Sequence, residues 1–203
     1  MTKYKLTYFN AMGRAELMRM MFALKGVEYE DVRISKEDWP NMKPTTPFGQ
    51  LPLLEVDGKV LAQSVAIAIY LANKLGLNGA NDWEAAKIHE IFGATEDLFN
   101  AVIPAFKCED PETKKKLIAE FEKDHLDLYF QRIGKMLVAN GTGYIVGKQI
   151  SVADLLLANI AGLFGHMCQN TMAKHPDLTK FKEKIFAIPQ IKKWIETRPK
   201  TDM

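Results

Sequence analysis

The sequence predicts an α/β half built on a small mixed sheet, followed by an all-α half. Strand-like and helix-like patterns alternate over about the first eighty residues, whereas only amphipathic helical patterns follow Gly79. Between two short apolar runs lies Asp57-Gly58, a pair favoured in tight hairpins, so the sheet gains antiparallel strands. We therefore expect domains at residues 1–78 and 82–203.

The α/β half begins with a strand–helix–strand unit. Residues 5–9 are β-prone, residues 14–25 carry an apolar stripe at helical spacing that ends at Gly26, and residues 28–34 alternate. Two strands joined by a helix are expected to be parallel, with a right-handed crossover.

The rest of this half supplies a hairpin and a closing helix. Residues 35–49 are rich in loops, and residues 53–56 and 59–62 are the two hairpin strands. Ser64 is expected to cap a helix that ends at Gly76. The predicted order is βαβ-α-ββα, which matches a thioredoxin-like layout.

The second half reads as a bundle of helices. A Ser-x-x-Asp pattern at Ser151 and Asp154 resembles a capping box, with Ile150 and Leu155 placed for a hydrophobic staple. The segment that follows is almost wholly apolar and predicts a buried helix. The expected helices are residues 83–106, 111–138, 155–167, 177–186 and 189–197.

Composition excludes several classes of protein. The chain has 203 residues, 47% of them hydrophobic, which is too many for a disordered chain. Its 27 basic and 25 acidic residues give a net charge of +2, so neither a nucleic acid nor a membrane surface is an expected partner. The sequence has no apolar run near the roughly 18 residues of a membrane span, and its N-terminus lacks the apolar region of a signal peptide.

Cysteine and histidine usage narrows the chemistry. Cys108 and Cys168 are the two cysteines, so the chain has no disulfide framework and no CxxC pair. Low cysteine usage favours a reducing compartment, and we expect a cytoplasmic protein. The four histidines show no spacing typical of metal ligands, and no metal is expected.

The junction after the first strand is the main candidate for chemistry. Redox proteins of thioredoxin-like layout place a CxxC there, but this chain has Tyr8 and no cysteine. The junction could instead bind a thiol carried by a ligand, with the Tyr8 hydroxyl holding the sulfur. A plain strand aromatic is an equally good interpretation of Tyr8 from its position alone.

Two further positions have both a binding and a structural interpretation. Pro52 precedes a strand, where a cis Leu51–Pro52 bond would turn the Leu51 backbone toward a ligand, although trans is the commoner isomer. Gln63 and Ser64 open a helix, whose free amides and dipole suit a carboxylate. A plain N-cap serine is the commoner case.

Several motifs in one register resemble the sigma class of cytosolic glutathione S-transferases. The resemblance covers the whole chain and includes the second-domain capping motif and the ending Arg198-Pro199. The matching segments of the first half are Tyr4–Phe9, Gly13–Glu16, Asp38–Pro40, Pro47–Pro52, Glu55–Gly58 and Gln63–Ile67.

The resemblance implies an enzyme whose co-substrate is glutathione. Tyr8 would be the catalytic tyrosine that donates a hydrogen bond to the sulfur, and Arg14 would favour the thiolate or support Tyr8. A free thiol has a pKa of about 8.5, so a donor that lowers it raises the fraction of nucleophile at neutral pH. The other implied glutathione-binding residues are Trp39, Lys43, Gln50, Leu51, Pro52, Gln63, Ser64 and Asp97.

The resemblance also implies a second substrate and a second subunit. A hydrophobic electrophile would bind an apolar pocket between the two domains, lined by Phe9, Met12, Gly13 and Pro104. Asp97 would reach across a two-fold homodimer to the γ-glutamyl amine. The implied function is conjugation of glutathione to hydrophobic electrophiles, as in detoxification, either alone or together with reduction of lipid peroxides.

Two other functions occur within this class. The N-terminal stretch is very similar to glutathione-dependent prostaglandin D synthases, which isomerise an endoperoxide. The chain departs from the vertebrate synthases at Pro104, where they have a tryptophan, and at residues 93–97, where only the end is acidic. A non-catalytic, crystallin-like protein is the third alternative, against which the intact glutathione-binding set argues.

Overall fold

The computed structural model describes residues 2–201, apart from the side chain of residue 166. It divides into two compact units, Met1–Leu77 with Phe186–Met203, and Asn78–Ile185. The first holds a mixed sheet with helices, and the second is helical over the residues described. This architecture confirms the predicted fold class.

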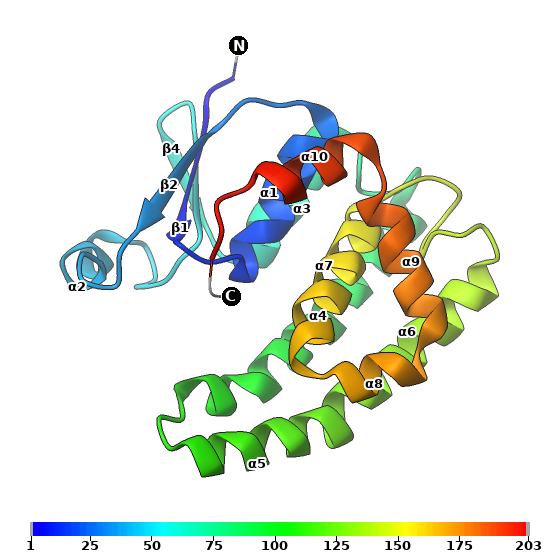
Figure 1. Ribbon diagram of the computed structural model, residues 1–203. Helices are drawn as coiled ribbons and strands as arrows, with labels where there is room; N and C mark the ends of the chain where they lie inside the picture. The colour runs from blue at the N-terminus through cyan, green and yellow to red at the C-terminus, as the bar shows by residue number, and fades with distance from the viewer. Residues whose placement is uncertain (1, 202–203) are drawn as a thin grey trace. The chain divides into compact units, whose positions relative to one another are not determined.

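The first unit contains the predicted α/β elements and the last helix of the chain. Its helices α1 and α3 lie on one side of the sheet and α2 on the other (Figure 1). The elements are β1 (Tyr4–Phe9), η1 (Gly13–Ala15), α1 (Glu16–Lys25), β2 (Glu30–Ile34), α2 (Trp39–Met42), η2 (Lys43–Thr45), β3 (Leu53–Val56), β4 (Lys59–Ala62), α3 (Ser64–Leu75) and α10 (Pro189–Thr197).

The sheet has the order β2-β1-β3-β4. Strand β1 is parallel to β2 and antiparallel to β3, with Leu6 opposite Leu54, and β3 is antiparallel to β4. Asp57 and Gly58 both have positive φ, 50° and 83°, as a tight hairpin turn requires. The predicted βαβ unit and hairpin are therefore confirmed.

The core of this unit lies between the sheet and α1 and α3. Leu6 and Leu54 from the sheet are fully buried, as are Phe22 of α1 and Leu71 of α3. Alternation in the strands and the helical stripe direct these side chains to the same layer. Burial of this apolar surface holds β1, and therefore its C-terminal end at Tyr8, in a fixed place.

Helix α10 groups with the first unit because it packs against α1, as Figure 1 shows. Ile191 on its inner face is fully buried. This grouping differs from the expected second domain at residues 82–203, which included the C-terminal segment. The sequence pattern of α10 shows an apolar stripe but does not identify the surface that covers it.

The second unit is helical. Its N-cap residue Asn81 accepts a hydrogen bond from the Glu84 amide at 2.9 Å, as a cap does. None of its described helices is long and apolar enough to span a bilayer. The helices are α4 (Asp82–Lys107), α5 (Pro111–Phe121), η3 (Glu122–Leu126), α6 (Asp127–Asn140), α7 (Val152–Met167), α8 (Gln169–Lys174) and α9 (Pro176–Phe186).

The single helix expected over residues 111–138 is interrupted by a π-helical segment, η3. A π turn shifts the register by one residue, which suits the spacing of five between the buried Phe121 and Leu126. The spacing returns to four at the fully buried Phe130. The expectation of one regular helix was wrong because it ignored this change of period.

The predicted capping box is confirmed. Asp154 is fully buried and accepts hydrogen bonds from the amide and hydroxyl of Ser151, at 2.7 and 2.8 Å. Its other oxygen accepts from the Ile145 amide at 2.8 Å, so one carboxylate fixes both the helix start and the preceding loop. Burial raises the pKa of Asp154, partly offset by these hydrogen bonds.

Candidate active site

Tyr8 lies near the end of β1, where the chain turns toward α1. Its hydroxyl oxygen accepts a hydrogen bond from the backbone amide of Arg14 at 3.3 Å. An oxygen that accepts an N–H keeps its own O–H for donation to another acceptor. The local fold therefore places a neutral hydrogen-bond donor at the point where redox proteins of this layout carry a thiol.

Gly13 fits the Tyr8 ring closely. It has a φ of +40°, and an added Cβ would lie 2.6 Å from the Tyr8 hydroxyl oxygen. The sequence assigned Gly13 only to the pocket for a second substrate. The structure gives it a second task, because glycine lets the turn approach the tyrosine and lets the Arg14 amide reach the hydroxyl.

The Arg14 side chain links this turn to α3. Its Nη1 donates to Ser64 Oγ at 3.2 Å. Helix α3 begins at Ser64, and its cap position is Gln63, whose side chain makes no capping hydrogen bond. The expectation that the Ser64 side chain caps a helix beginning after it was therefore wrong.

Gln63 has a backbone conformation uncommon for a side-chain-bearing residue. Its φ is +73°, in the left-handed region that favours glycine. Its Nε2 donates to Gln50 Oε1 at 3.2 Å, and Gln50 directly precedes the Leu51–Pro52 peptide, which is cis and not the commoner trans isomer. The backbone strain of the positive φ at Gln63 is retained where the surroundings fix the residue, which is common at binding sites.

Aromatic rings connect the end of β1 to α2. The Phe9 ring meets the Tyr8 ring at 5.6 Å and the Trp39 ring at 5.5 Å between centroids, both edge to face. Lys43 follows α2 directly, and its stem lies near Gly49. The first unit therefore connects Tyr8, Phe9 and Trp39 by ring contacts.

The remaining predicted site residues belong to different regions. Met12, half-buried, precedes η1 in the first unit. Asp97 and Pro104 lie on α4 of the second unit, where both are exposed and Pro104 lies near the C-terminal end of the helix. Cys108 follows this helix. Contacts within the first unit therefore support the Tyr8, Arg14 and Ser64 group more directly than they support these positions.

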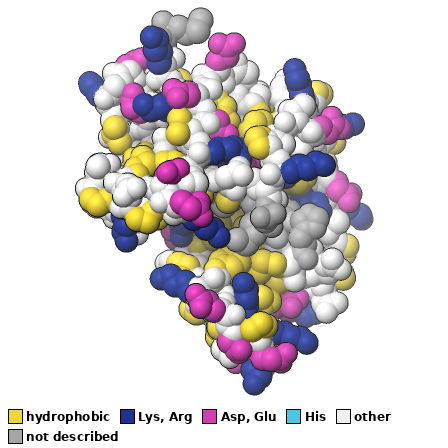
Figure 2. All heavy atoms as spheres, turned by 60° about the vertical axis from the view of Figure 1, so that its left-hand side comes forward, with side chains coloured by type: hydrophobic (Ala, Val, Ile, Leu, Met, Phe, Trp, Pro, Cys, Tyr) yellow, Lys and Arg dark blue, Asp and Glu magenta, His cyan; other side chains and the backbone are white. Residues whose placement is uncertain are grey.

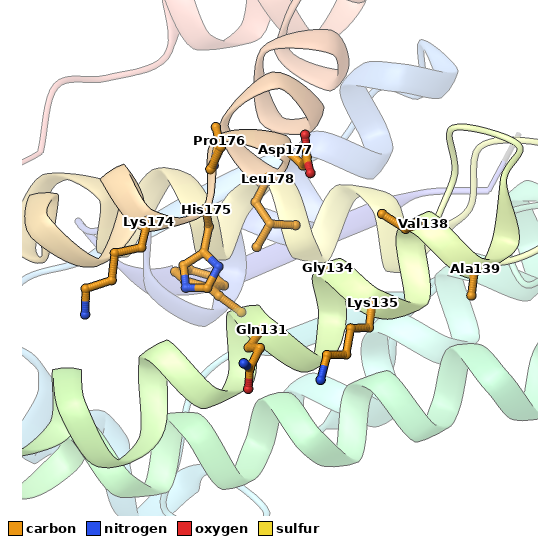
Figure 3. Close-up of a pocket in the computed structure, with 11 residues that line it drawn as sticks. Gln131, Gly134, Lys135, Val138, Ala139, Lys174, His175, Pro176, Asp177 and Leu178 are labelled. Atoms are coloured by element: carbon orange, nitrogen blue, oxygen red, sulfur yellow. The ribbon is translucent and has the colours of Figure 1, made fainter.

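A separate pocket occurs in the second unit. It has a volume of about 390 Å³ and lies between α6 and the turn that opens α9, as Figure 3 shows. His175 lines it, but its Nε2 is already paired with Asp127 Oδ1 at 2.8 Å, an interaction that lowers the pKa of Asp127. This pair ties α6 to the α8–α9 turn and has a structural explanation.

Charge on the surface is mixed. Figure 2 shows basic and acidic side chains interspersed on the face it draws, in keeping with the net charge of +2. Among the described residues, no group of three or more His, Cys, Asp or Glu is arranged to hold a metal ion.

Sequence reasoning missed two charged residues beneath the site. Glu16 and Arg19 of α1 are 1% and 0% exposed, although their segment reads as an ordinary amphipathic helix. Arg19 Nη1 donates to the Ala11 carbonyl at 2.8 Å, in the turn that carries Gly13. A charged pair at positions i and i+3 usually lies in solvent, so the sequence carried no clear signal of their burial.

Comparison with known proteins identifies the class that this fold and site define. Residues 4–73 match the family model described as "Glutathione S-transferase, N-terminal domain", and residues 96–198 match "Glutathione S-transferase, C-terminal domain". Together these cover most of the chain.

Individual relatives point to the same family as the two family models. Glutathione S-transferase 1 of Ascaris suum is 40% identical over 204 residues, covering 99% of each chain. A monomeric glutathione S-transferase from the hookworm Necator americanus superposes with a TM-score of 0.92 at 40% identity, covering 99% of this chain and 100% of that one. A prostaglandin synthase D of Nilaparvata lugens has a TM-score of 0.90 at 37% identity, covering 98% and 100%. The chain belongs to the glutathione S-transferase family.

Proposed function

We propose that this protein is a glutathione transferase in which Tyr8 activates the glutathione thiol for attack on hydrophobic electrophiles. The observation that carries this proposal is the Tyr8 hydroxyl, which the Arg14 amide and Gly13 hold at the turn after β1. The two family models and the Ascaris suum relative support the reaction class.

Tyr8 would stabilise the sulfur anion by donating its O–H. A hydrogen bond to the charged form lowers the pKa of a thiol, and a change of one pKa unit corresponds to about 1.4 kcal/mol. The Arg14 amide, by donating to the Tyr8 oxygen, polarises the phenol and makes it a stronger donor. The thiolate then forms a carbon–sulfur bond with the electrophile, which either accepts the electron pair or loses a leaving group.

The rest of glutathione would bind along the first unit. The N-terminus of α3 at Gln63 and Ser64 offers amides for the γ-glutamyl carboxylate. The Leu51 backbone, presented by Pro52, would pair with the cysteinyl part. Trp39 and Lys43 would hold the glycine end, and Gln50 would make a further polar contact. The strained φ of Gln63 supports a binding role at this helix start.

The finer assignments are also proposals. The motif resemblance supports the sigma class, a homodimer in which Asp97 reaches the partner's γ-glutamyl group, and a cytoplasmic location. It also supports a pocket for the electrophile made by Phe9, Met12, Gly13 and Pro104. Because one relative is described as monomeric, sedimentation velocity of the purified protein tests the dimer.

The experiment that tests the main proposal compares the parent protein with Tyr8→Phe. Steady-state turnover of glutathione with a chloronitroaromatic acceptor is expected in the parent, and the loss of one preorganised donor should lower kcat/KM by roughly 10²-fold. Glutathione affinity, measured by calorimetry, should change little. Absence of turnover in the parent, or an unchanged rate in Tyr8→Phe, would contradict the proposal.

A second candidate function is glutathione-dependent isomerisation of a prostaglandin endoperoxide. Its support is the similarity to a protein titled prostaglandin synthase D, at 37% identity. The same thiolate would attack one endoperoxide oxygen and break the O–O bond, and loss of a proton from the adjacent carbon would then form a carbonyl, break the S–O bond and return the thiolate. Product analysis after addition of the endoperoxide decides between them, because spontaneous decay gives a mixture and an isomerase gives one product.

A further inference from the structure

A buried ionic cluster lies beneath the Tyr8 turn. Arg19 is fully buried and donates to three acceptors: Ala11 O at 2.8 Å, Glu16 Oε2 at 3.3 Å and Asp31 Oδ1 at 3.1 Å. Burial of a guanidinium is unfavourable unless such partners compensate for lost water. The cluster therefore needs a structural or functional reason beyond ordinary core packing.

The other end of the cluster reaches the C-terminal segment. Glu16 Oε1 accepts a hydrogen bond from Trp194 Nε1 at 2.8 Å and from Arg198 Nη1 at 2.6 Å. Glu16 Oε2 faces Arg19, so the carboxylate uses its two oxygens for different partners. One side chain thus connects the end of the chain to the buried arginine.

The groups that face the cluster are mostly charged. Asp31 on β2 also pairs with Arg33, whose Nη2 lies 2.9 Å from Asp31 Oδ2. The Tyr29 phenol lies nearby, and its pKa is raised mainly by burial and secondarily by Asp31. Arg19, Arg33 and Arg198 therefore surround the carboxylates of Glu16 and Asp31.

Arg19 acts on the turn through the Ala11 carbonyl. This carbonyl lies two residues before Gly13, whose position the Tyr8 hydroxyl limits closely. Arg14, the next residue, supplies the amide that donates to Tyr8. A displacement of Ala11 would therefore move both groups that set the position of the tyrosine oxygen.

We propose that the C-terminal segment positions Tyr8 through this cluster: Arg198 and Trp194 hold Glu16, Glu16 holds Arg19, and Arg19 holds the turn at Ala11. Glu16, Arg19 and Arg198 are positioning residues. The hydrogen bonds given above join them to one another and to the Ala11 carbonyl, and not to the Tyr8 hydroxyl. The inference rests on the proposed role of Tyr8 and extends it to residues near the end of the chain.

The test uses Arg198→Ala in the full-length protein, with Arg198→Lys as the conservative variant and Lys192→Ala as the matched control. Lys192 lies on α10, but its partner is the exposed Glu196 at 3.9 Å. The readouts are the pH profile of kcat/KM, the KM for glutathione, and the ultraviolet absorbance of the thiolate in the glutathione complex.

In Arg198→Ala we expect the apparent thiol pKa to rise by about one pH unit, which lowers the thiolate fraction, and with it kcat/KM, by up to about tenfold at a pH below the thiol pKa of the parent. The KM for glutathione should stay within about twofold, because the residues proposed to bind its two ends are untouched. Arg198→Lys should recover part of the rate, and Lys192→Ala should match the parent. Trp194→Phe, which removes one N–H donor and keeps an aromatic ring, should change the profile in the same direction.

A lower melting temperature in Arg198→Ala with an unchanged pH profile and thiolate absorbance would overturn the proposal, because the link would then be only structural. If Arg198→Ala does not fold, the pH profile of Trp194→Phe decides in the same way. Failure of the proposed function is distinguishable, since it would show as no turnover in the parent or no effect of Tyr8→Phe.

Discussion

The two units bury polar groups for different purposes. In the first unit, Glu16 and Arg19 lie beneath the Tyr8 turn, and their contacts converge on the proposed site. In the second unit, Asp154 and the Thr95–Tyr129 hydroxyl pair, 2.8 Å apart, stabilise the ends and packing of helices. Burial alone therefore does not distinguish a positioning group from a structural one. The distinction comes from which atoms the buried group binds.

A positive φ also serves different purposes at different places in the chain. Gln63 and Gly13, both with positive φ, lie in the first unit at the proposed site. Gly26 and Gly76 in the first unit and Gly141 in the second, also with positive φ, end helices as ordinary caps. Substitutions at the proposed site in the first unit should thus reduce activity more than stability, and those in the second unit should do the reverse.

The largest expected effect is that of Gly13→Ala. The new Cβ would lie 2.6 Å from the Tyr8 hydroxyl oxygen, and the tyrosine side chain can relieve the contact only by moving. We expect kcat/KM to fall roughly 10²- to 10³-fold, or about 3–4 kcal/mol, with a loss of about 1 kcal/mol in stability from the positive φ. Kinetics and urea unfolding measure the two effects, and a stability loss that exceeds the activity loss would contradict the contrast.

Asp154→Ala should lower stability more than activity, the opposite of Gly13→Ala. It leaves the buried amides of Ile145 and Ser151 without their acceptor, so we expect a loss of about 2–3 kcal/mol in the free energy of unfolding. Asp154→Asn keeps one acceptor oxygen and should lose less. Activity per folded molecule should remain within about twofold, as measured in the cold at matched protein concentration.

The fold was largely predictable because its signals are local. Alternation in the strands, the Asp57-Gly58 turn and the Ser151–Asp154 box each depend on residues a few positions apart. The π-helical segment was not predicted, since its signal is only a one-residue change in the spacing after Phe121. The helix start at Ser64 was misplaced because an unusual φ at Gln63 has no sequence signature.

The candidate site was predictable where a residue able to do the chemistry stands at a position that the sequence pattern defines. Tyr8 stands at the junction that the strand–helix pattern defines, and its contact with the Arg14 amide supports that choice. The Glu16–Arg198 contact joins residues 182 positions apart, so no local pattern could reveal it. Long-range polar contacts need the packing of α10 on α1, which sequence periodicity does not specify.

Cys168 offers a pH test within the second unit. Burial, and secondarily Glu122, raises the pKa of its thiol from 9.0 to about 11. Below pH 9 the thiol is neutral in both states; above it the unfolded thiol ionises first, so stability is lost as the pH rises toward 11. Cys168→Ala should therefore reduce the decline in urea midpoint over this interval. An identical decline in both proteins would contradict the prediction.

The smallest expected effect is that of Gly134→Ala, the matched control for Gly13→Ala. Gly134 lies inside α6, and an added Cβ would meet nothing within 4 Å. Alanine has the higher helix propensity and restricts the unfolded chain, so we expect a gain of about 0.5–1 kcal/mol in the free energy of unfolding. Activity should equal that of the parent. Because the same chemical change is made in both units, opposite results at residues 13 and 134 would attribute the loss of activity in Gly13→Ala to the tyrosine beside Gly13. A loss of activity in Gly134→Ala would instead show that the helical unit also sets the geometry of catalysis.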